Sequence, residues 1–408
     1  MSFSFGEPSN PLHYRDFNLL SSGQLLSSVG TQMQIVAVAW QIYLLTNSKV
    51  ALGLIGPARG LPLVAGSVYA GVIADSFDRR RVLLVTQSTM AILSAMLAVL
   101  TATGDITPWA IYVLIALSSA AQAADQPARS ALIPSLVPRP VLPRAISIIV
   151  ALREFATIAG PALGGILIAA TGVGPVYVVD ALSCGFVLAA VLLMHTRAGK
   201  ISDTRVNFRA VAEGWRFMVH KRIILLVQGL DFLANFFGAS TVLFPVFART
   251  IFQVGPQGLG LLYGAGACGA VIGALLFGYF GRVQRQGVFI LASIVVYGAA
   301  ITLFGLSPWF LLGLGFLVVS GAADSVSASL RETISQLETP DELRGRMTAI
   351  NTMFVGGGPQ MGDLEAGVVA SMIGTRDAVA LGGVMTVAVA IITALFSPTI
   401  RQYRLHRS

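Results

Sequence analysis

The chain has 408 residues, of which 55% are hydrophobic and only 11% are charged, and its mean hydropathy is +0.77. A soluble domain carries about 25% charged residues, so this composition excludes an ordinary soluble protein and indicates an integral membrane protein. The net charge of +8 does not indicate nucleic-acid binding, because the basic residues are scattered over short segments between apolar runs.

Twelve stretches of the chain are apolar enough, and long enough, to cross a bilayer. The first begins near Phe17 and lacks a small-residue cleavage site, so we interpret it as a span and not as a removable signal. The expected spans are 17–46, 50–75, 82–103, 108–134, 144–171, 174–195, 222–250, 256–281, 286–305, 308–336, 345–373 and 376–399. The sequence therefore predicts an all-α membrane protein with twelve transmembrane helices.

The distribution of basic residues predicts how these spans are oriented. With the N-terminus in the cytoplasm, 20 of the 27 Lys and Arg residues fall on the inner side, and only Lys49, Arg249 and Arg376 fall outside. Cytoplasmic loops of membrane proteins are enriched in Lys and Arg. We therefore expect a multi-pass protein of a bacterial inner membrane with both termini in the cytoplasm.

The two halves of the sequence repeat each other. Arg129, Pro138 and Arg144 recur 202 residues later as Arg331, Pro340 and Arg346. A duplicated six-span unit predicts two pseudo-symmetric six-helix bundles with a substrate site between them near the midplane. We place the bundles at 1–196 and 221–408, joined by a cytoplasmic linker at 197–220.

The linker contains a short amphipathic pattern. Phe208, Val211, Trp215 and Met218 share one helical face. This pattern predicts an interfacial helix on the inner leaflet. A simple tether between the halves and a lipid-sensing element both fit it.

The loop between spans 2 and 3 reads Gly71-Val72-Ile73-Ala74-Asp75-Ser76-Phe77-Asp78-Arg79-Arg80-Arg81. It resembles the signature of the major facilitator superfamily, and Gly71, Asp75, Arg79 and Arg80 fall on that pattern. Ser76 stands where the family usually has an arginine. The resemblance implies a conformational latch formed by Gly71, Asp75, Arg79, Arg80, Asp125 and Arg129. Asp125 and Arg129 lie four residues apart on span 4, so they can pair.

Span 5 contains Gly160-Pro161-Ala162-Leu163-Gly164-Gly165, which resembles the antiporter motif of exporters in this superfamily. Proline removes a helix hydrogen bond and glycine thins the helix surface. We therefore expect Gly160, Pro161, Gly164 and Gly165 to form a close-packed pivot against span 8. Over nearly its whole length, the chain resembles the branch of this superfamily that contains the enterobactin exporter and several drug efflux pumps. The end of span 4, Asp125-Gln126-Pro127-Ala128-Arg129, is part of this resemblance.

Charged residues within spans are costly in lipid and are functional candidates by default. Arg59 on span 2, Arg153 and Glu154 on span 5, and Asp363 and Glu365 on span 11 are such candidates for a substrate cavity or an outer gate. Arg153 and Glu154 are adjacent and point about 100° apart on a helix, so we do not expect them to pair with each other.

Asp231 is the leading candidate for proton coupling. It lies about 14 Å into span 7, close to the midplane of a roughly 30 Å hydrocarbon core. A carboxyl group at that depth can take up a proton, because a low dielectric disfavours its charged form. Asn235 lies on the same face, and the first-half counterpart of Asp231 is the neutral Gln24. A structural aspartate is the competing interpretation, and Glu154 is the rival coupling acid.

Nothing in the sequence indicates a metal, a cofactor or catalysis. Cys184 and Cys268 lie far apart without a C-x-x-C pattern, and the four histidines lie in tails or near span ends. No G-x-x-x-x-G-K-[ST], G-x-S-x-G or H-E-x-x-H motif occurs. An intramembrane enzyme is therefore a weak alternative, as is a sensor without a signalling domain.

These features and the resemblance predict a secondary active transporter that exports a small amphiphilic organic molecule, drug-like or siderophore-like, by alternating access. We expect proton antiport, no cofactor, and a monomer in the lipid bilayer whose partners are its substrate and protons. A passive facilitator or importer of the same fold is the alternative. Dependence of transport on a pH gradient would distinguish it from a proton-coupled exporter.

The orientation is tested by cysteine labelling in a background that lacks Cys184 and Cys268. Lys49→Cys and Arg376→Cys should react with a membrane-impermeant thiol reagent added to intact cells, because both positions are expected outside. Arg80→Cys should react only after the membrane is permeabilised. The reverse labelling pattern would contradict the predicted topology.

Overall fold

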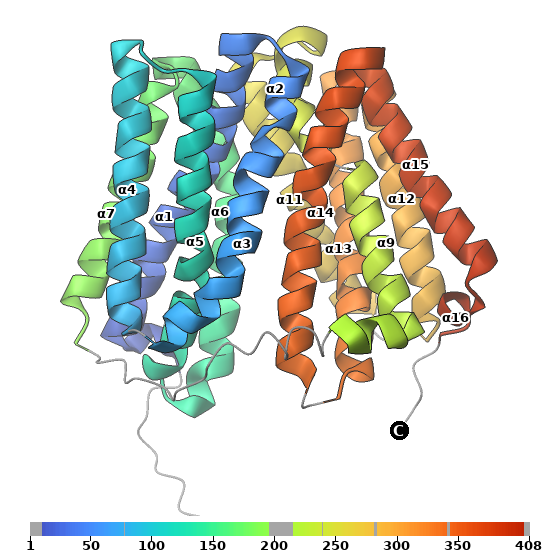
Figure 1. The fold of residues 1–408 in the computed structure, drawn as a ribbon, viewed down its shortest axis with the longest axis horizontal. Coiled ribbons are helices and arrows are strands. Elements are labelled where there is room, and N and C mark those ends of the chain that lie inside the picture. The colour runs from blue at the N-terminus through green and yellow to red at the C-terminus, as the bar shows by residue number, and fades with distance from the viewer. Residues whose placement is uncertain are drawn as a thin grey trace, which may run out of the picture. The chain divides into compact units, whose positions relative to one another are not determined.

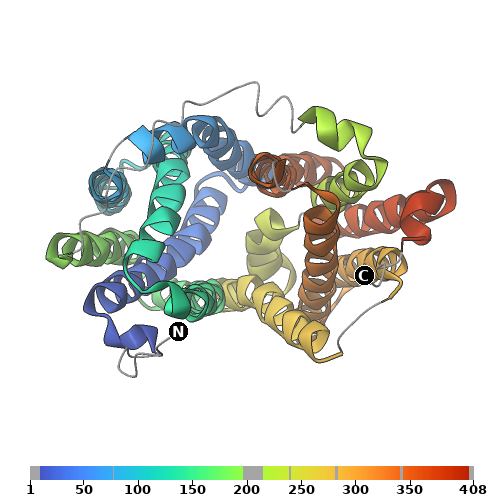
Figure 2. The same ribbon diagram turned by 90° about the horizontal axis from the view of Figure 1, so that it is seen from below.

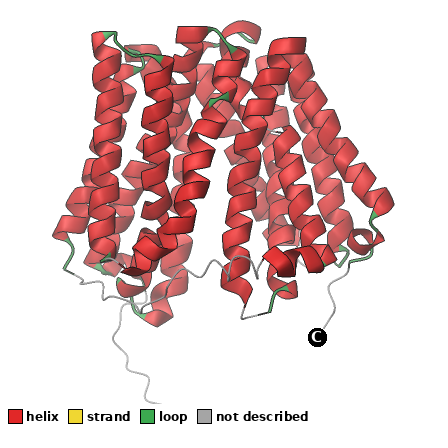
Figure 3. Cartoon of the chain, in the orientation of Figure 1, coloured by secondary structure: helices red, strands yellow, loops and turns green. Residues whose placement is uncertain are grey.

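The structure is a computed structural model that describes residues 10–76, 78–195, 215–238, 240–280, 284–340 and 343–403. Within these ranges the chain is almost entirely helical and contains no β-strand (Figure 3). The predicted all-helical architecture is therefore confirmed for this part of the chain. Backbone alone is described for parts of the helices that begin at Ile55 and Arg344.

The chain forms two compact units. Unit 1 comprises Met1–Ala37 and Pro62–Val206, and unit 2 comprises Val38–Leu61 and Asn207–Ser408. The boundaries fall inside helices. The beginning of α3 packs with unit 2 because Gly56 and Gly60 lie directly on α14. The second half of α1 also belongs to unit 2, where the Tyr43 and Thr250 hydroxyl groups are hydrogen-bonded at 3.0 Å.

Unit 1 is built from five long helical segments. They are contributed by α1 (Arg15–Thr46), α4 (Arg79–Thr103), α5 (Pro108–Leu132), α6 (Leu142–Thr171) and α7 (Gly174–Leu193), and the end of α3 (Ile55–Ser76) belongs to the same unit. Short 3-10 turns lie at Pro11–His13, Ile133–Ser135 and Arg139–Val141. Helix α4 lies beside α5 and α7 (Figures 1 and 2).

Local sequence explains where these helices begin and end. The Asp78 side chain accepts a hydrogen bond from the Arg80 backbone N–H at 2.8 Å and so caps α4. Thr107 caps α5, and Pro108 follows it at the first helical position, where no hydrogen bond is lost. Helix α6 ends at Gly172, whose φ of 86° suits a residue without a Cβ.

Unit 2 holds the remaining elements. They are α2 (Lys49–Gly53), α9 (Arg222–Gly238), a 3-10 turn at Thr241–Leu243, α10 (Phe244–Val246), a π-helical turn at Phe247–Ile251, α11 (Gly255–Phe280), α12 (Gln286–Leu306), α13 (Phe310–Glu338), α14 (Arg344–Ile373), α15 (Thr375–Phe396) and α16 (Pro398–Arg401). Helix α11 packs on α13, α12 packs on α15, and α9 packs on α14 (Figure 1).

Each unit has an apolar core at the end where the sequence predicts the cytoplasmic side. In unit 1 this core joins the start of α1 to the end of α7, with Phe17, Leu83, Leu132 and Val191 buried in it. In unit 2 the corresponding core joins the start of α9 to the end of α13 and includes Met218. Helix ends that are distant in sequence are thus held together by apolar burial.

Eight helices in the described part are long and apolar enough to cross a membrane, judged by length and composition. The other predicted spans, 17–46, 50–75, 108–134 and 345–373, are helical as α1, α2 with α3, α5 and α14, but are not among those eight. The count of twelve spans therefore stays a prediction.

The predicted linker helix is described only at its end. Residues 215–220 are helical, Trp215 is exposed, and Met218 is fully buried in the unit 2 core. Phe208 and Val211 lie outside the described residues. The interfacial position of this helix also stays a prediction.

Close packing of α11 on α13 should depend on one glycine. A Cβ at Gly321 would collide with the backbone carbonyl of Gly266, whereas a Cβ at Gly315, on the same helix, would meet nothing within 4 Å. Gly321→Leu should therefore cost at least about 1–3 kcal/mol of stability through overpacking. Thermal unfolding in detergent should show a lower midpoint for Gly321→Leu than for Gly315→Leu, and equal midpoints would contradict this packing.

Candidate functional site

A polar cavity of about 240 Å³ lies within unit 2 between α9, α13 and α14, and we call it the acidic cavity. Its charged lining consists of three carboxylates and one guanidinium, from Asp231, Asp324, Glu332 and Arg331. Residues 228, 231 and 235 are three and four positions apart on α9, so their polar side chains share one face of an otherwise apolar helix.

An ion pair between two helices forms the centre of the acidic cavity. The Arg331 Nη2 atom on α13 lies 2.5 Å from Asp231 Oδ1 on α9, and the two side chains are 8% and 6% exposed. Asn235 Nδ2 donates to the same carboxylate oxygen at 2.9 Å. The sequence predicts that Asp231 and Asn235 share a helix face, but it does not indicate Arg331 as their partner.

The Arg331 guanidinium is shared by two carboxylates. Its Nη1 donates to Ser327 Oγ at 2.7 Å, and its Nη2 also lies 3.6 Å from Asp324 Oδ1. One positive charge thus faces two negative charges on the described side chains. When two carboxylates share a site, binding of a proton by one of them relieves their repulsion.

Helix α14 completes the polar wall of the acidic cavity. Gln228 Nε2 donates to Asn351 Oδ1 at 3.0 Å, and Asn351 Nδ2 donates to Glu332 Oε2 at 3.2 Å. Amide groups therefore connect α9, α14 and α13 at the level of the ion pair.

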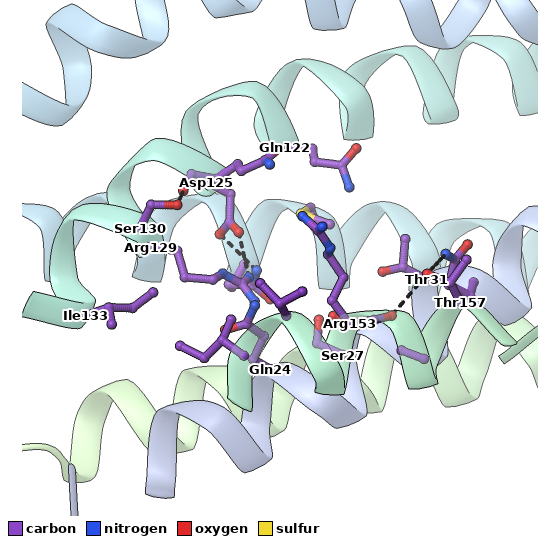
Figure 4. A pocket seen from close by; sticks show the side chains of 18 of the residues that line it. Gln24, Ser27, Thr31, Gln122, Asp125, Arg129, Ser130, Ile133, Arg153 and Thr157 are labelled. Carbon is purple, nitrogen blue, oxygen red and sulfur yellow. Dashed lines mark hydrogen bonds and ion pairs between the residues drawn. The ribbon is translucent and has the colours of Figure 1, made fainter. Parts of the chain in front are cut away.

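A second polar cavity, of about 330 Å³, lies within unit 1 between α1, α4, α5 and α6, and we call it the glutamine cavity (Figure 4). Five glutamines line it, at positions 24, 32, 87, 122 and 126. Its charged lining is one carboxylate and two guanidinium groups, from Asp125, Arg129 and Arg153.

The Asp125 carboxylate is fully engaged by surrounding donors. Arg129 Nη2 lies 2.5 Å from Asp125 Oδ2, which confirms that this i,i+4 pair forms. The other oxygen accepts hydrogen bonds from Thr86 Oγ1 at 2.8 Å and from Gln87 Nε2 at 2.9 Å, both on α4. Both oxygens of the Asp125 carboxylate are thus bound by side-chain donors of the protein.

The two cavities occupy equivalent places in the sequence repeat. Of the ten residues that line the acidic cavity, nine have a repeat counterpart in the lining of the glutamine cavity. The pairs are Gln24 with Asp231 and Ser28 with Asn235, 207 residues apart, and Gln122 with Asp324, Gln126 with Ala328, Arg129 with Arg331, Ser130 with Glu332, Ile133 with Ser335, Ile149 with Asn351 and Thr157 with Pro359, 202 residues apart.

The two cavities differ in which helix carries the acid that pairs with the buried arginine. In unit 1 it is Asp125, on the same helix as Arg129, and position 24 on α1 is a neutral glutamine. In unit 2 the counterpart of Asp125 is Ser327, and the acid is Asp231 on another helix. The shortest ion pair of the arginine therefore lies within one helix in unit 1 and between two helices in unit 2, where Asp324 on the same helix as Arg331 is further away, at 3.6 Å.

A row of glycines brings α2 and the beginning of α3 against α14 within unit 2, and we call this contact the glycine seam. Cβ atoms at Gly53, Gly56 and Gly60 would lie too close to Gln360, Asp363 and Gly367 on α14. Lys49 Nζ donates to the Ala370 carbonyl at 3.0 Å at the end of the seam.

Two of the candidate acids lie on α14 at or near this seam. The Oδ1 atom of Asp363 is buried without a hydrogen-bond partner, and Arg59 is the cation that acts on this carboxylate electrostatically. Glu365 lies two residues further along and is partly exposed. Neither acid lines either polar cavity. Their role in outer gating stays a prediction.

The expectation that Arg153 and Glu154 do not pair is wrong. Arg153 Nη2 lies 3.3 Å from Glu154 Oε1, with the two side chains 58% and 39% exposed. Adjacent helix positions point apart, but both side chains are long enough to reach each other outside the helix surface. Arg153 extends from α6 into the glutamine cavity (Figure 4).

The glycines of span 5 have their described close contacts within unit 1. Gly160 packs on Val29 and Gln32 of α1, and Gly164 packs on Met33. Pro161 and Gly165 are buried on the same helix. The motif thus thins α6 where α1 crosses it, and the pivot against span 8 stays a prediction.

The loop between spans 2 and 3 is described in part. Gly71 and Asp75 belong to helix α3, but their side-chain surroundings lie outside the described residues. Arg79 Nη1 donates to the Ala131 carbonyl at 2.6 Å, and Arg80 Nη2 donates to the Leu192 carbonyl at 2.8 Å. Both arginines therefore bind carbonyls at the C-terminal ends of neighbouring helices, where the helix dipole favours a cation.

The comparisons with known proteins agree with this architecture. The family model described as transmembrane secretion effector matches residues 7–403. The enterobactin exporter EntS of Salmonella typhi is 28% identical over 389 residues, covering 95% of this chain and 94% of the relative. EntS of Escherichia coli O1:K1 is 26% identical over 388 residues, covering 95% and 93%.

Solved structures of transporters share the fold. The crystal structure of the nucleoside transporter NupG superposes with a TM-score of 0.76 at 16% identity, covering 95% of this chain and all of that one. A bacterial homologue of the human lysosomal transporter Spinster, in an inward-facing and unoccupied conformation, superposes with a TM-score of 0.69 at 16% identity, covering 94% and 95%.

The helical fold and its polar cavities thus define a multi-pass membrane transporter and not an enzyme. The chain belongs to the transmembrane secretion effector family of the major facilitator superfamily.

Removal of one member of the Asp125–Arg129 pair should be far more damaging than removal of both. Asp125→Leu leaves the mostly buried Arg129 without its counter-charge and should cost about 3–5 kcal/mol of stability. The double variant Asp125→Leu/Arg129→Met should recover most of this loss, because no charge is then left unpaired. Unfolding midpoints in detergent measure the effect, and additive losses in the double variant would contradict a structural pair.

Proposed function

We propose that the chain is a proton-coupled exporter that works by alternating access and carries a small amphiphilic organic molecule, drug-like or siderophore-like. In this proposal twelve spans form two six-helix bundles, at 1–196 and 221–408, with a cytoplasmic linker at 197–220. The protein works as a monomer in a bacterial inner membrane with both termini in the cytoplasm. The enterobactin exporter relatives support a siderophore-like cargo and the outward direction.

The observation that carries the proton coupling is the imbalance of charge at Arg331. Asp231 and Asp324 both approach this guanidinium, at 2.5 and 3.6 Å, and Asp231 is almost fully buried. A proton on Asp231 removes the excess negative charge, and loss of that proton restores the ion pair. The carboxylate therefore has two states that differ in what Arg331 binds.

The position of the pair between two helices converts this exchange into a structural change. Ionised Asp231 holds α9 to α13 through Arg331, and protonated Asp231 attracts the guanidinium much less. Arg331 then still donates to Ser327 and still faces the Asp324 carboxylate, both on its own helix. Protonation thus weakens the bond between α9 and α13 without leaving the arginine uncompensated.

The other groups that face Asp231 fit this role. Asn235, on its own helix, donates to it, and Tyr297, on α12, contributes a neutral hydroxyl nearby that donates to the Gly238 carbonyl at 3.2 Å. Glu332 and Asn351 line the same cavity. Glu154, the rival coupling acid, pairs with its neighbour on an exposed surface and so lacks the buried partner on another helix.

The direct test uses proteoliposomes with an imposed pH gradient. The cargo is found first, by exposing a deletion strain to a panel of toxic compounds and measuring siderophore secretion alongside. Asp231→Asn should abolish uphill transport of that cargo, because the side chain can no longer carry a proton. It should preserve exchange of labelled for unlabelled cargo, which needs no net proton movement. Uphill transport by Asp231→Asn would contradict the proposal.

A second variant keeps the negative charge beside Arg331 but changes the helix that carries it. Asp231→Gln/Ser327→Asp gives unit 2 the arrangement found in unit 1, with the acid and the arginine on one helix. The arginine stays compensated, so the protein should fold and exchange its cargo. Uphill transport should nevertheless be lost, because the pair no longer connects α9 to α13. Normal coupling in this variant would show that the position of the acid does not matter.

A further inference from the structure

A surface groove of about 510 Å³ lies within unit 1 between the neighbouring helices α4 and α5, and we call it the α4–α5 groove. Both helices contribute apolar side chains to its lining: Val82, Val85 and Leu93 from α4, and Leu117, Ala121 and Ala124 from α5. Val85 and Leu117 are 66% and 52% exposed. Helix α4 is long and apolar enough to cross a membrane, so we expect lipid tails beside these exposed side chains.

One charged side chain lines this groove among the described residues, that of Arg81 at the beginning of α4. The two preceding arginines are already engaged, because Arg79 and Arg80 donate to backbone carbonyls at 2.6 and 2.8 Å. The Arg81 side chain is exposed and forms no hydrogen bond or ion pair with the described part of the chain. Its guanidinium is therefore available to an anion.

The other polar groups of the groove are bonded within the protein. Thr86 Oγ1 donates to Asp125 Oδ1 at 2.8 Å, and Thr89 Oγ1 donates to the Val85 carbonyl at 2.9 Å. A ligand with several polar groups would leave most of them without partners against the apolar lining, which is costly. The groove therefore fits a long apolar body with one polar, anionic end.

The length of the groove agrees with the depth of one lipid leaflet. Leu93 lies 12 residues after Arg81 on the same helix, which corresponds to about 18 Å of helix rise. One leaflet contributes about 15 Å to a hydrocarbon core of roughly 30 Å. An acyl chain that begins at a headgroup on Arg81 can therefore follow the groove to the middle of the bilayer.

We propose that the α4–α5 groove binds an anionic phospholipid, with the phosphate on Arg81 and an acyl chain along Val85, Leu93 and Leu117. A guanidinium binds two oxygens of a phosphate at once, which makes arginine well suited to this headgroup. In the predicted orientation Arg81 lies on the cytoplasmic side, so the lipid belongs to the inner leaflet.

The bound lipid supports a contact that unit 1 already makes. The groove shares no lining residue with the glutamine cavity, but Thr86 connects the two, since its hydroxyl donates to the Asp125 carboxylate. An acyl chain that covers both walls of the groove holds α4 against α5. The lipid therefore stabilises the pair of helices that carries the hydrogen bond between Thr86 and Asp125.

Native mass spectrometry of the detergent-purified protein tests the class of lipid. The probes are dioleoyl phosphatidylglycerol, which is anionic, and dioleoyl phosphatidylethanolamine, which has the same chains and no net charge. The wild-type protein should bind phosphatidylglycerol more tightly. Arg81→Gln should weaken that binding about fivefold, the effect expected for one basic residue at an anionic membrane surface, and should leave phosphatidylethanolamine binding unchanged.

Arg139→Gln is the matched control, because Arg139 is exposed at the end of the 3-10 turn region after α5 and does not line the groove. It should bind both lipids like the wild-type protein. Equal affinity of the wild-type protein for the two lipids, or an equal loss in Arg81→Gln and Arg139→Gln, would overturn the proposal. A wild-type dimer that binds no lipid would assign the groove to a second copy of the chain instead.

A second pair of variants tests the apolar part of the groove. Ala121→Phe places a ring where the acyl chain should lie, and Val113→Phe adds the same ring at an exposed position of α5 outside the groove. Phosphatidylglycerol should raise the unfolding midpoint of Val113→Phe as much as that of the wild-type protein, and that of Ala121→Phe much less. Glycerol 3-phosphate, a headgroup without acyl chains, should raise none of them.

Equal stabilisation of Ala121→Phe and Val113→Phe by phosphatidylglycerol, or stabilisation by glycerol 3-phosphate alone, would contradict a lipid in this groove. If Ala121→Phe does not fold, the comparison of Arg81→Gln with Arg139→Gln decides the question, because both replace exposed side chains and leave the packing of the helices intact.

Discussion

An arginine buried among transmembrane helices needs a counter-charge, and the way each unit supplies it distinguishes the two cavities. A guanidinium left unpaired in a low dielectric is strongly destabilising. Unit 1 supplies the charge from the same helix, four residues before Arg129, so movement of α5 leaves the pair intact. Unit 2 supplies it from α9, so the Asp231–Arg331 pair is also a connection between helices. In the second arrangement, a proton on the acid weakens an ion pair that connects two helices.

The remaining differences between the cavities agree with a division of tasks. The acidic cavity has more carboxylates than guanidinium groups, and hydrogen bonds connect Gln228, Asn351 and Glu332 in its wall. The glutamine cavity has the opposite balance of charge and holds the unpartnered atoms of Gln24, Gln87 and Arg129. The excess of carboxylates supports the proposal that protons bind in the acidic cavity. The duplicated scaffold builds the two cavities from equivalent positions, and of the nine counterpart pairs only Arg129 and Arg331 are the same residue type.

Much of the fold and of the candidate site was predictable from the sequence, because the depth of a residue in a span and its counterpart in the repeat are both found by counting along the chain. Helix rise placed Asp231 near the midplane, and the repeat identified Gln24 as its counterpart and Arg331 as that of Arg129. The bond between Asp231 and Arg331 was missed because it depends on how α9 lies against α13. Thr86 and Gln87 were missed for the same reason, since they reach Asp125 from another helix. The backbone directions at adjacent helix positions predicted that Arg153 and Glu154 do not pair. Their side chains are nevertheless long enough to form an ion pair.

The central claim is that Asp231 is the acid that gains and loses the coupling proton. Infrared difference spectroscopy of the protein in lipid, with its aspartates isotopically labelled, reports this directly through the carbonyl stretch of a protonated carboxylic acid. As the pH is lowered, the wild-type protein should develop an isotope-shifted band of this kind. The band should be absent from Asp231→Asn and retained in Asp125→Asn. A band that persists in Asp231→Asn, or that disappears in Asp125→Asn, would contradict the account.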